Sequence, residues 1–401
     1  MASLEATAEY RGTNPAASTA EQVASDVPQL RDISKELPEM LIYTTSADSY
    51  EQVRAFFNAS VTQQPLAVIR PRTDTEVAAT VRELHARGIP FGIRSGGHDM
   101  DAAQAQGRDG VLIDLRGLDS IVVAEDKRSV RVGGGTLGIK LSQFLHQHKL
   151  ITPHGWCQTV SIAGWALGGG YGYASAFYGL GADQMLGGRV VLANGDIVDT
   201  DEHPDLLWAL RGAGNGSFGI VVELRLKVYP ETGFLGGFLA FPNAQVESVL
   251  AGFAEFEQEL PINFTGEASH MALPGVGPVF AWLFAWTSQD DELGEGWAFL
   301  EKMKALGTPI MNTVAAAAGV PDATAQASDF EEYKKWTDNL VEDIANQGHS
   351  LPWGNRNLAP EKDMDWVATY GDETVARLKE IKRKFDPDNV FRTGYPRLDL
   401  L

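Results

Sequence analysis

The chain has 401 residues and a formal net charge of −20 at pH 7, which argues against nucleic acid or an anionic membrane surface as a partner. Its length suits two domains, and a hydrophobic fraction of 44% is sufficient for a large core. No apolar run approaches the ~20 residues that a bilayer-spanning helix needs.

The N-terminal region, residues 1–40, is rich in Ala, Ser, Glu and Gln, and we expect a partly disordered extension there. It lacks the apolar segment of a secretory signal. The single cysteine, Cys157, permits no intramolecular disulfide, so nothing in the chain indicates an oxidising compartment. These features favour a cytoplasmic location, and secretion stays open because a removed signal would leave the same sequence.

Globular patterning begins near Leu41. A strand over 66–70, a helix over 76–85 capped near Thr73, and a strand over 90–94 suit a βαβ unit. Further elements are expected in chain order as strands at 111–115, 121–124 and 129–132 and a helix at 137–148.

The segment after residue 184 begins with a hairpin, because Asn194-Gly195 is the strongest short-range hairpin signal. A short helix, a glycine loop and a long strand that ends at Pro230 follow. From about Glu231 glycine loops become rare, which indicates a second domain. We expect its helices around 292–306 and 328–346, and a last helix over 372–385.

In the predicted strand around 279–286, aromatic and aliphatic residues alternate, so the aromatic side chains share one face of the strand. Its aromatic face is more consistent with a hydrophobic core than with a substrate-binding wall. The aromatic residues are Phe280, Trp282, Phe284 and Trp286.

Two glycine-rich stretches carry the strongest functional signal. The first, FGIRSGGHDM at 91–100, is predicted to be a strand followed by a tight turn, with free N–H groups and Arg94 available to hold a pyrophosphate. The second, PHGWCQTVSIAGWALGGGYG at 153–172, has a run of glycines that is costly unless the backbone must approach something closely. We hypothesise that both stretches enclose one large cofactor, attached to His98 and Cys157.

Four motifs resemble those of the berberine bridge enzyme-like covalent flavoproteins, a family within the vanillyl alcohol oxidase and p-cresol methylhydroxylase superfamily. They occur in the same order as in that family. They are RSGGH at 94–98, GWCQTVSIAGWALGGGYG at 155–172, RGAGNGSFGIV at 211–221 and KRKFDPDNVF at 382–391. The resemblance covers about residues 40–397. It implies an α+β, two-domain FAD-binding fold of the p-cresol methylhydroxylase type, with an antiparallel-sheet substrate domain.

The domain boundaries follow from the resemblance and from the change in glycine usage. We predict the extension at 1–40, the FAD-binding domain at 41–230, the substrate domain at 231–379, and a C-terminal segment at 380–401 that returns to the FAD-binding domain.

The resemblance implies bicovalent FAD, with His98 bonded to the flavin 8α-methyl and Cys157 to flavin C6. Val160 occupies the family's oxygen-gating position, where valine is permissive, so the resemblance favours an oxidase. The predicted cofactor-binding residues are Arg94, Ser95, Gly96, Gly97, His98, Asp99, Cys157, Thr159, Val160, Ala163, Gly164, Gly169, Gly170, Tyr171, Gly172, Gly219, Ile220, Val221, Asn389 and Tyr395.

The implied reaction removes a hydride from an alcohol, hemiacetal or activated C–H bond of a small molecule and passes the electrons to O2, giving H2O2. Two alternatives stay open: a dehydrogenase with another electron acceptor, and a flavin-bound protein without turnover. A Rossmann enzyme is disfavoured because the glycines of RGAGNGSFG follow a helix. No metal is implied, and the sequence does not set the oligomeric state.

The chain departs from the family pattern in several places. Asp99 stands where the family commonly has Ser, and we expect its carboxylate to point away from the cofactor or to bond local backbone. Asn389 is open between a turn-capping role and one near the flavin. The catalytic base is not identified by any motif, and the candidates are Tyr171, Tyr370 and Tyr395, with Tyr173, His270 and Glu267 beside them.

Overall fold

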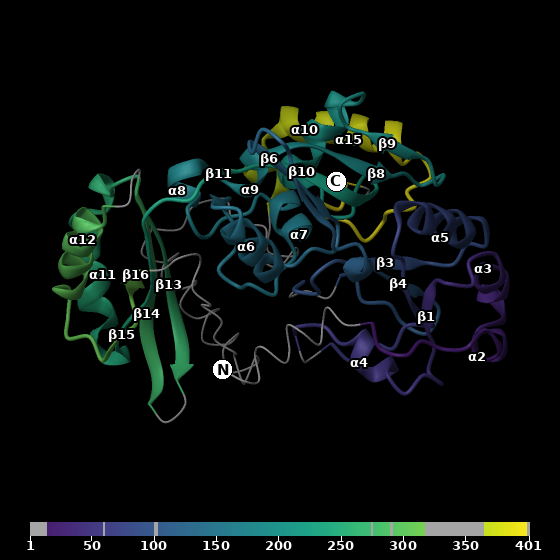
Figure 1. Cartoon of the computed structure of the whole chain (residues 1–401), viewed down its shortest axis with the longest axis horizontal. Helices are drawn as coiled ribbons and strands as arrows, with labels where there is room; N and C mark the ends of the chain where they lie inside the picture. The colour runs from purple at the N-terminus through teal and green to yellow at the C-terminus, as the bar shows by residue number, and fades with distance from the viewer. Residues whose placement is uncertain are drawn as a thin grey trace.

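The computed structural model describes residues 14–58, 61–99, 103–273, 276–288, 292–316 and 365–398. Two lobes are visible in Figure 1, the larger built on two sheets and the smaller on one. The helix expected at 328–346 lies outside the described residues. None of the helices in the described ranges combines the length and apolar character that a membrane crossing requires.

The first sheet of the larger lobe has four strands in the order β1-β2-β4-β3. Both β2 and β3 run parallel to β4, which lies between them, so the strands of the predicted βαβ unit are not neighbours. Their connecting helix is capped as expected, since Thr73 Oγ1 accepts a hydrogen bond from the Glu76 N–H at 3.1 Å. The elements are β1 (Leu41–Tyr43), α4 (Tyr50–Arg54), β2 (Ala67–Arg70), α5 (Asp74–Ala86), β3 (Phe91–Arg94), β4 (Val111–Asp114) and η2 (Leu115–Gly117).

The second sheet is antiparallel, with the order β5-β6-β10-β8-β9. The predicted hairpin joins β8 to β9, and Gly195 in its turn has a φ of +81°, a conformation that glycine adopts at low cost. The strands are β5 (Ile121–Val123), β6 (Ser129–Gly133), β8 (Met185–Val191), β9 (Ile197–Asp199) and β10 (Ile220–Lys227).

Helices pack on this second sheet around a common apolar cluster that includes Leu141, Trp165 and Leu210. A small pair of strands, β7 (Leu150–Ile151) and β11 (Tyr229–Pro230), leads toward the smaller lobe. The helices are α6 (Gly138–Gln147), α7 (Ile162–Leu167), α8 (Ser175–Tyr178), α9 (Gly181–Gln184) and α10 (Pro204–Ala213).

Part of the N-terminal extension forms helices that pack on the larger lobe. Residues 20–36 form α2 (Ala20–Asp26), η1 (Pro28–Leu30) and α3 (Arg31–Glu36). Val23, Val27, Leu30 and Ile33 are buried and join the core of the first sheet. Their helical spacing within a polar background buries enough apolar surface to order the segment.

The smaller lobe is one antiparallel sheet covered by two helices. Its aromatic face confirms the core interpretation, because the four aromatic side chains of β14 pack in one cluster with residues of α11 and α12. On the opposite face, Leu283 and Ala285 contact Trp156 and Tyr173 of the larger lobe. The elements are β12 (Phe234–Pro242), η3 (Asn243–Gln245), α11 (Val246–Ala254), η4 (Glu257–Glu259), β13 (Phe264–Leu273), β14 (Gly277–Thr287), α12 (Gly294–Lys304), β15 (Met311–Asn312) and β16 (Ala315–Ala316).

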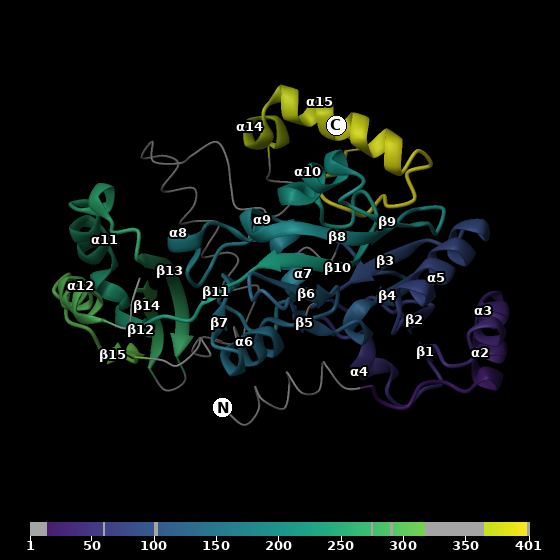
Figure 2. The same cartoon turned by 45° about the horizontal axis from the view of Figure 1, so that its top comes forward.

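The C-terminal segment returns to the larger lobe earlier than residue 380. After α14 (Trp366–Tyr370), helix α15 (Asp372–Phe385) lies along α10, as Figure 2 shows. The Tyr370 hydroxyl donates to the Gly212 carbonyl at 2.8 Å, and the Arg377 guanidinium lies 3.9 Å above the Trp208 ring centroid. Lys382 Nζ is buried and donates to the Ser217 carbonyl at 2.7 Å.

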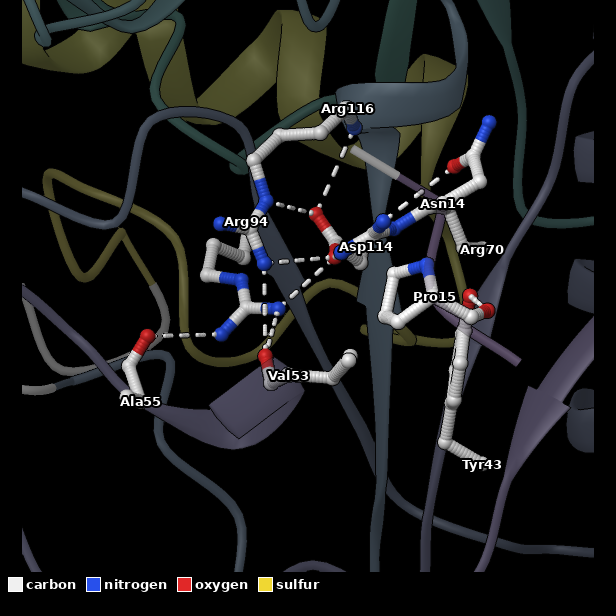
Figure 3. A network of polar contacts seen from close by, with 9 residues as sticks. All are labelled: Asn14, Pro15, Tyr43, Val53, Ala55, Arg70, Arg94, Asp114 and Arg116. Carbon is white, nitrogen blue, oxygen red and sulfur yellow. Dashed lines mark hydrogen bonds and ion pairs between the residues drawn. The ribbon is translucent and has the colours of Figure 1, made fainter. Parts of the chain in front are cut away.

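A buried carboxylate, Asp114, lies where three strands of the first sheet end (Figure 3). Its Oδ2 atom is 2.8 Å from Arg70, 2.7 Å from Arg94 and 2.8 Å from Arg116. Arg94 also donates to the carbonyls of Val53, at 2.6 Å, and Ala55, at 3.1 Å. Burial would raise the pKa of Asp114, but the three guanidiniums hold it well below its ordinary value.

We predict that Asp114→Asn destabilises the fold by about 3 to 5 kcal/mol, because three buried cations lose their counter-charge. The pKa of Asp114 is depressed, so its contribution is full above the unfolded value near ~4 and is lost as pH falls below it. Denaturant unfolding between pH 7 and pH 3 should therefore show a shallower pH dependence in the variant. Asp119→Asn, which removes an exposed ion pair with Lys140, is the control, and equal stability losses in both variants would contradict the prediction.

Candidate functional site

The two glycine-rich stretches contact each other. The loop of Ser95 to His98 follows β3, and Gly97 turns it with a φ of +75°. A Cβ on Gly96 would lie 2.6 Å from the backbone nitrogen of Ser161, so only glycine allows this approach. The Ser95 hydroxyl donates to the Gly134 carbonyl, which anchors the start of the loop.

One hydroxyl lies between the two predicted attachment residues. Thr159 Oγ1 is 2.9 Å from Nε2 of His98 and 3.2 Å from Sγ of Cys157. The His98 ring also stacks on Phe57, with centroids 4.2 Å apart and planes 23° from parallel. The Phe57 N–H donates to the Gly97 carbonyl at 2.9 Å, which holds this stack beside the loop. An imidazole and a thiol from distant parts of the chain are thus held in one polar group.

The turn around Val160 brings the chain from Cys157 into α7. The Val160 N–H donates to the Cys157 carbonyl at 3.1 Å, and Ser161 caps the helix by accepting from the Gly164 N–H at 3.2 Å. Ala163 is buried in the helix. Val160 is partly buried against the core of the larger lobe.

Two glycines of the run approach other parts of the protein closely, which is one kind of close approach that a glycine run indicates. A Cβ on Gly170 would lie 2.7 Å from the Trp165 ring, and one on Gly172 would lie 2.4 Å from the His154 carbonyl oxygen. The Trp165 indole N–H also donates to the Tyr171 carbonyl at 2.8 Å. A Cβ on Gly169 would meet no heavy atom of the described structure within 4 Å, so this glycine borders open space.

A tyrosine of the larger lobe is paired with a carboxyl of the smaller lobe. The Tyr171 hydroxyl donates to Oε2 of Glu267 on β13. Tyr171 packs against the cluster that includes Trp156, the neighbour of Cys157 in the sequence. Burial, and then the charge of Glu267, raise the pKa of Tyr171, and burial raises the pKa of Glu267. Tyr171 and Glu267, two of the candidate bases, therefore lie together near Trp156, which precedes the predicted attachment residue Cys157.

Tyr173 lies in the same cluster as Tyr171 and Trp156, whereas His270, Tyr370 and Tyr395 lie elsewhere. The Tyr173 ring packs between Trp156 and Phe234. The His270 ring lies 5.3 Å from that of Phe280, and burial lowers its pKa to about 4. Tyr370 lies on the helical layer of the larger lobe, as described above. Tyr395 is buried, and its N–H donates to the Asn215 carbonyl at 2.8 Å.

Arg94 and Asp99, the residues on either side of the loop from Ser95 to His98, both bond to other parts of the protein. The Arg94 guanidinium points into the buried cluster around Asp114, so the expectation that it is available to a pyrophosphate is wrong. The Arg94 side chain instead packs against the loop, since a Cβ on Gly97 would lie 3.1 Å from Arg94 Cδ. Asp99 Oδ2 accepts from the Gln104 N–H at 3.3 Å, which is the local backbone bond we expected.

The predicted cofactor-binding residues on β10 and just before it contact other parts of the protein core. A Cβ on Gly219 would lie 2.6 Å from Val190, and the side chains of Ile220 and Val221 are buried in the cores of the two sheets. Asn389 closes the turn after α15 with a φ of +49° and a bond from its N–H to the Asp386 carbonyl. This backbone fits the turn-capping alternative, because Asn tolerates the left-handed region, and a place near the flavin stays a prediction.

Phe57 lies outside all four motifs, so no pattern in the sequence pointed to it. Thr159 was predicted only as a cofactor-binding residue, without its position between His98 and Cys157. No local pattern could have revealed either role, because each depends on contact between segments far apart in the chain.

The family models that match are described as FAD binding domain, over residues 65–201, and berberine and berberine like, over 344–394. The chain is 36% identical over 288 residues to the FAD-linked oxidoreductase aurO of Gibberella zeae, covering 71% of this chain and 56% of that protein. It is 35% identical over 176 residues to glucooligosaccharide oxidase of Sarocladium strictum, covering 43% of this chain and 35% of that protein. The chain thus spans about half the length, or less, of these relatives.

The fold resembles that of 6-hydroxy-D-nicotine oxidase from Arthrobacter nicotinovorans, with a TM-score of 0.77, 20% identity, and coverage of 89% of this chain and 97% of that one. This likeness confirms the predicted α+β fold of the FAD-binding type. The chain therefore carries an FAD binding domain and a berberine-like domain, in agreement with the family resemblance of its motifs.

Proposed function

We propose that this chain is an FAD-linked oxidase whose cofactor is bonded to both His98 and Cys157. It takes a hydride from an alcohol, hemiacetal or activated C–H bond of a small molecule and passes the electrons to O2, giving H2O2. The observation that carries this proposal is the single hydroxyl of Thr159 within 2.9 Å of the imidazole and 3.2 Å of the thiol. The name of glucooligosaccharide oxidase, a relative, supports a sugar or other alcohol as the substrate class.

The residues present fit FAD. His98 and Cys157 are two nucleophiles at adjacent positions in space, and each belongs to a loop that contains glycine. The loop after β3 can present its backbone N–H groups to a pyrophosphate. When bound, FAD supplies the hydride acceptor, and the protein supplies binding, orientation and proton transfer.

We assign proton removal from the substrate to Glu267, assisted by Tyr171. Glu267 lies on the sheet face that contacts the larger lobe, and burial raises its pKa toward the range in which a carboxylate is an effective base. Tyr171 keeps its proton, because its own pKa is raised, and donates to the carboxylate. This donation fixes the carboxylate and leaves its other oxygen available to a substrate hydroxyl.

The attachment is tested by His98→Ala, Cys157→Ala and the double variant. Each single variant should remain linked through the other residue after long incubation with FAD, whereas the double variant should release all of its FAD on acid precipitation. Intact mass and peptide mapping provide the measurement. Parent-like flavin peptides in Cys157→Ala would show that the thioether assignment is wrong.

The base is tested by Glu267→Gln and Tyr171→Phe. Glu267→Gln should slow flavin reduction by substrate by about 10²- to 10⁴-fold with unchanged covalent flavin. Tyr171→Phe removes a hydrogen bond that lowers the pKa of Glu267, so the basic form should appear only at higher pH and the rate profile should move up in pH. Exposed Glu247→Gln on α11 is the control, and an unchanged reduction rate in Glu267→Gln would exclude this base.

The oxygen-gating role of Val160 is tested by Val160→Leu. The added methylene contributes only about 0.8 kcal/mol of apolar contact, but close-packed surroundings resist added volume more strongly. We expect slower reoxidation by O2 and nearly unchanged reduction by substrate, measured by stopped flow at equal flavin content. Val160→Ala should not slow reoxidation. Equal oxygen rates in parent and Val160→Leu would favour the dehydrogenase alternative, and no reduction by any substrate would favour a protein without turnover.

A further inference from the structure

The position of Thr159 has a consequence for how the two bonds to the cofactor form, and this consequence rests on the attachment proposed above. A hydroxyl has one hydrogen, so when it lies between two partners it donates to one and accepts from the other. Thr159 Oγ1 lies at hydrogen-bonding distance from both His98 Nε2 and Cys157 Sγ. The three groups therefore form a directed chain from sulfur through oxygen to nitrogen.

This chain has two proton arrangements. In one, the thiol donates to the Thr159 oxygen and the Thr159 hydrogen faces Nε2 of His98. In the other, both hydrogens have moved one place along, so that Nε2 carries a proton and the sulfur is a thiolate that accepts from Thr159. The second arrangement contains the nucleophilic form of the cysteine, since the thiolate and not the thiol attacks carbon.

The geometry also separates the two ring nitrogens of His98. Nε2 faces Thr159, so we assign the bond with the flavin 8α carbon to Nδ1. The stack on Phe57 opposes rotation of the His98 ring. The hydrogen bond from the Phe57 N–H to the Gly97 carbonyl keeps Phe57 beside the loop. After Nδ1 is bonded to carbon, Nε2 is the ring nitrogen that can still take a proton.

We propose that Thr159 is a positioning residue that relays the Cys157 thiol proton to Nε2 of His98, so that attachment at His98 precedes and assists attachment at Cys157. The thiolate then bonds to C6, and the C6 hydrogen is lost. The thiol proton, the C6 hydrogen and two electrons reach O2, which becomes H2O2, so atoms and electrons balance. The same accounting holds at His98, where the imidazole proton and one 8α hydrogen are lost.

The test compares Thr159→Val, which keeps shape without the hydroxyl, with Thr159→Ser, which keeps the hydroxyl. Thr136→Val is the matched control, because Thr136 is a buried threonine whose hydroxyl has no hydrogen-bond partner in the described structure. The full-length proteins are produced without riboflavin and incubated with FAD in air. Peptide mass then follows the rate of attachment at His98 and at Cys157 separately.

At pH 7, Thr159→Val should attach at Cys157 about 100-fold more slowly than the parent, the lower end of what a positioned base contributes. Thr159→Ser and Thr136→Val should stay within a fewfold of the parent. At about pH 9.5, where a thiol ionises without assistance, Thr159→Val should recover most of the parent rate. His98→Ala should show the same slow, pH-restored attachment at Cys157.

A parent that links at both residues while Thr159→Val links at Cys157 equally fast at pH 7 would overturn the relay and leave the proposed function intact. A slow rate in Thr159→Val that persists at pH 9.5, with equal slowing in Thr159→Ser, would also overturn the relay, because it indicates a packing defect. A parent that never links at Cys157 would overturn both the relay and the bicovalent attachment.

Discussion

The buried carboxylate of Asp114 is the interaction on which the geometry of the larger lobe depends. Arg70, Arg94 and Asp114 are the last residues of β2, β3 and β4, and their side chains meet at one edge of the sheet (Figure 3). Three guanidiniums around one carboxylate leave an excess of buried positive charge, and burial together with Arg116 lowers the pKa of Arg94 to about 9. The cluster sets where β3 ends and therefore where the loop to His98 begins.

Close backbone approach then joins this loop to the stretch that contains Cys157. Gly96 lies against Ser161, and Gly170 and Gly172 lie against Trp165 and the backbone of His154. A side chain at any of these positions would have to displace backbone or a large ring, which close-packed interiors resist. Gly96 thus joins the two loops, whereas Gly170 and Gly172 let the second stretch fold closely on itself. The polar group of His98, Thr159 and Cys157 also links the two loops.

The smaller lobe completes the site from the opposite side. The aromatic face of β14 forms the core of the smaller lobe, and the opposite face, with Leu283 and Ala285, contacts the larger lobe. Glu267 reaches Tyr171 across this boundary, and burial alters the pKa of both groups. The proposed base lies on one lobe and the proposed attachment residues lie on the other, so the chemistry that we propose would take place where the lobes meet.

The sequence by itself determined the α+β class, the presence of an FAD binding domain, the two attachment candidates and many elements, including the cap at Thr73, the hairpin at Asn194-Gly195 and the last helix. These features depend on short patterns: local periodicity, capping and turn chemistry. Only the tertiary structure decided that β4 lies between β2 and β3 and that Arg94 forms an ion pair with Asp114. It also decided that Thr159 contacts both His98 and Cys157, and that Glu267 accepts a hydrogen bond from Tyr171. Each of these results depends on packing between segments far apart in the chain, and a local pattern holds no information about which distant surface will cover a given side chain.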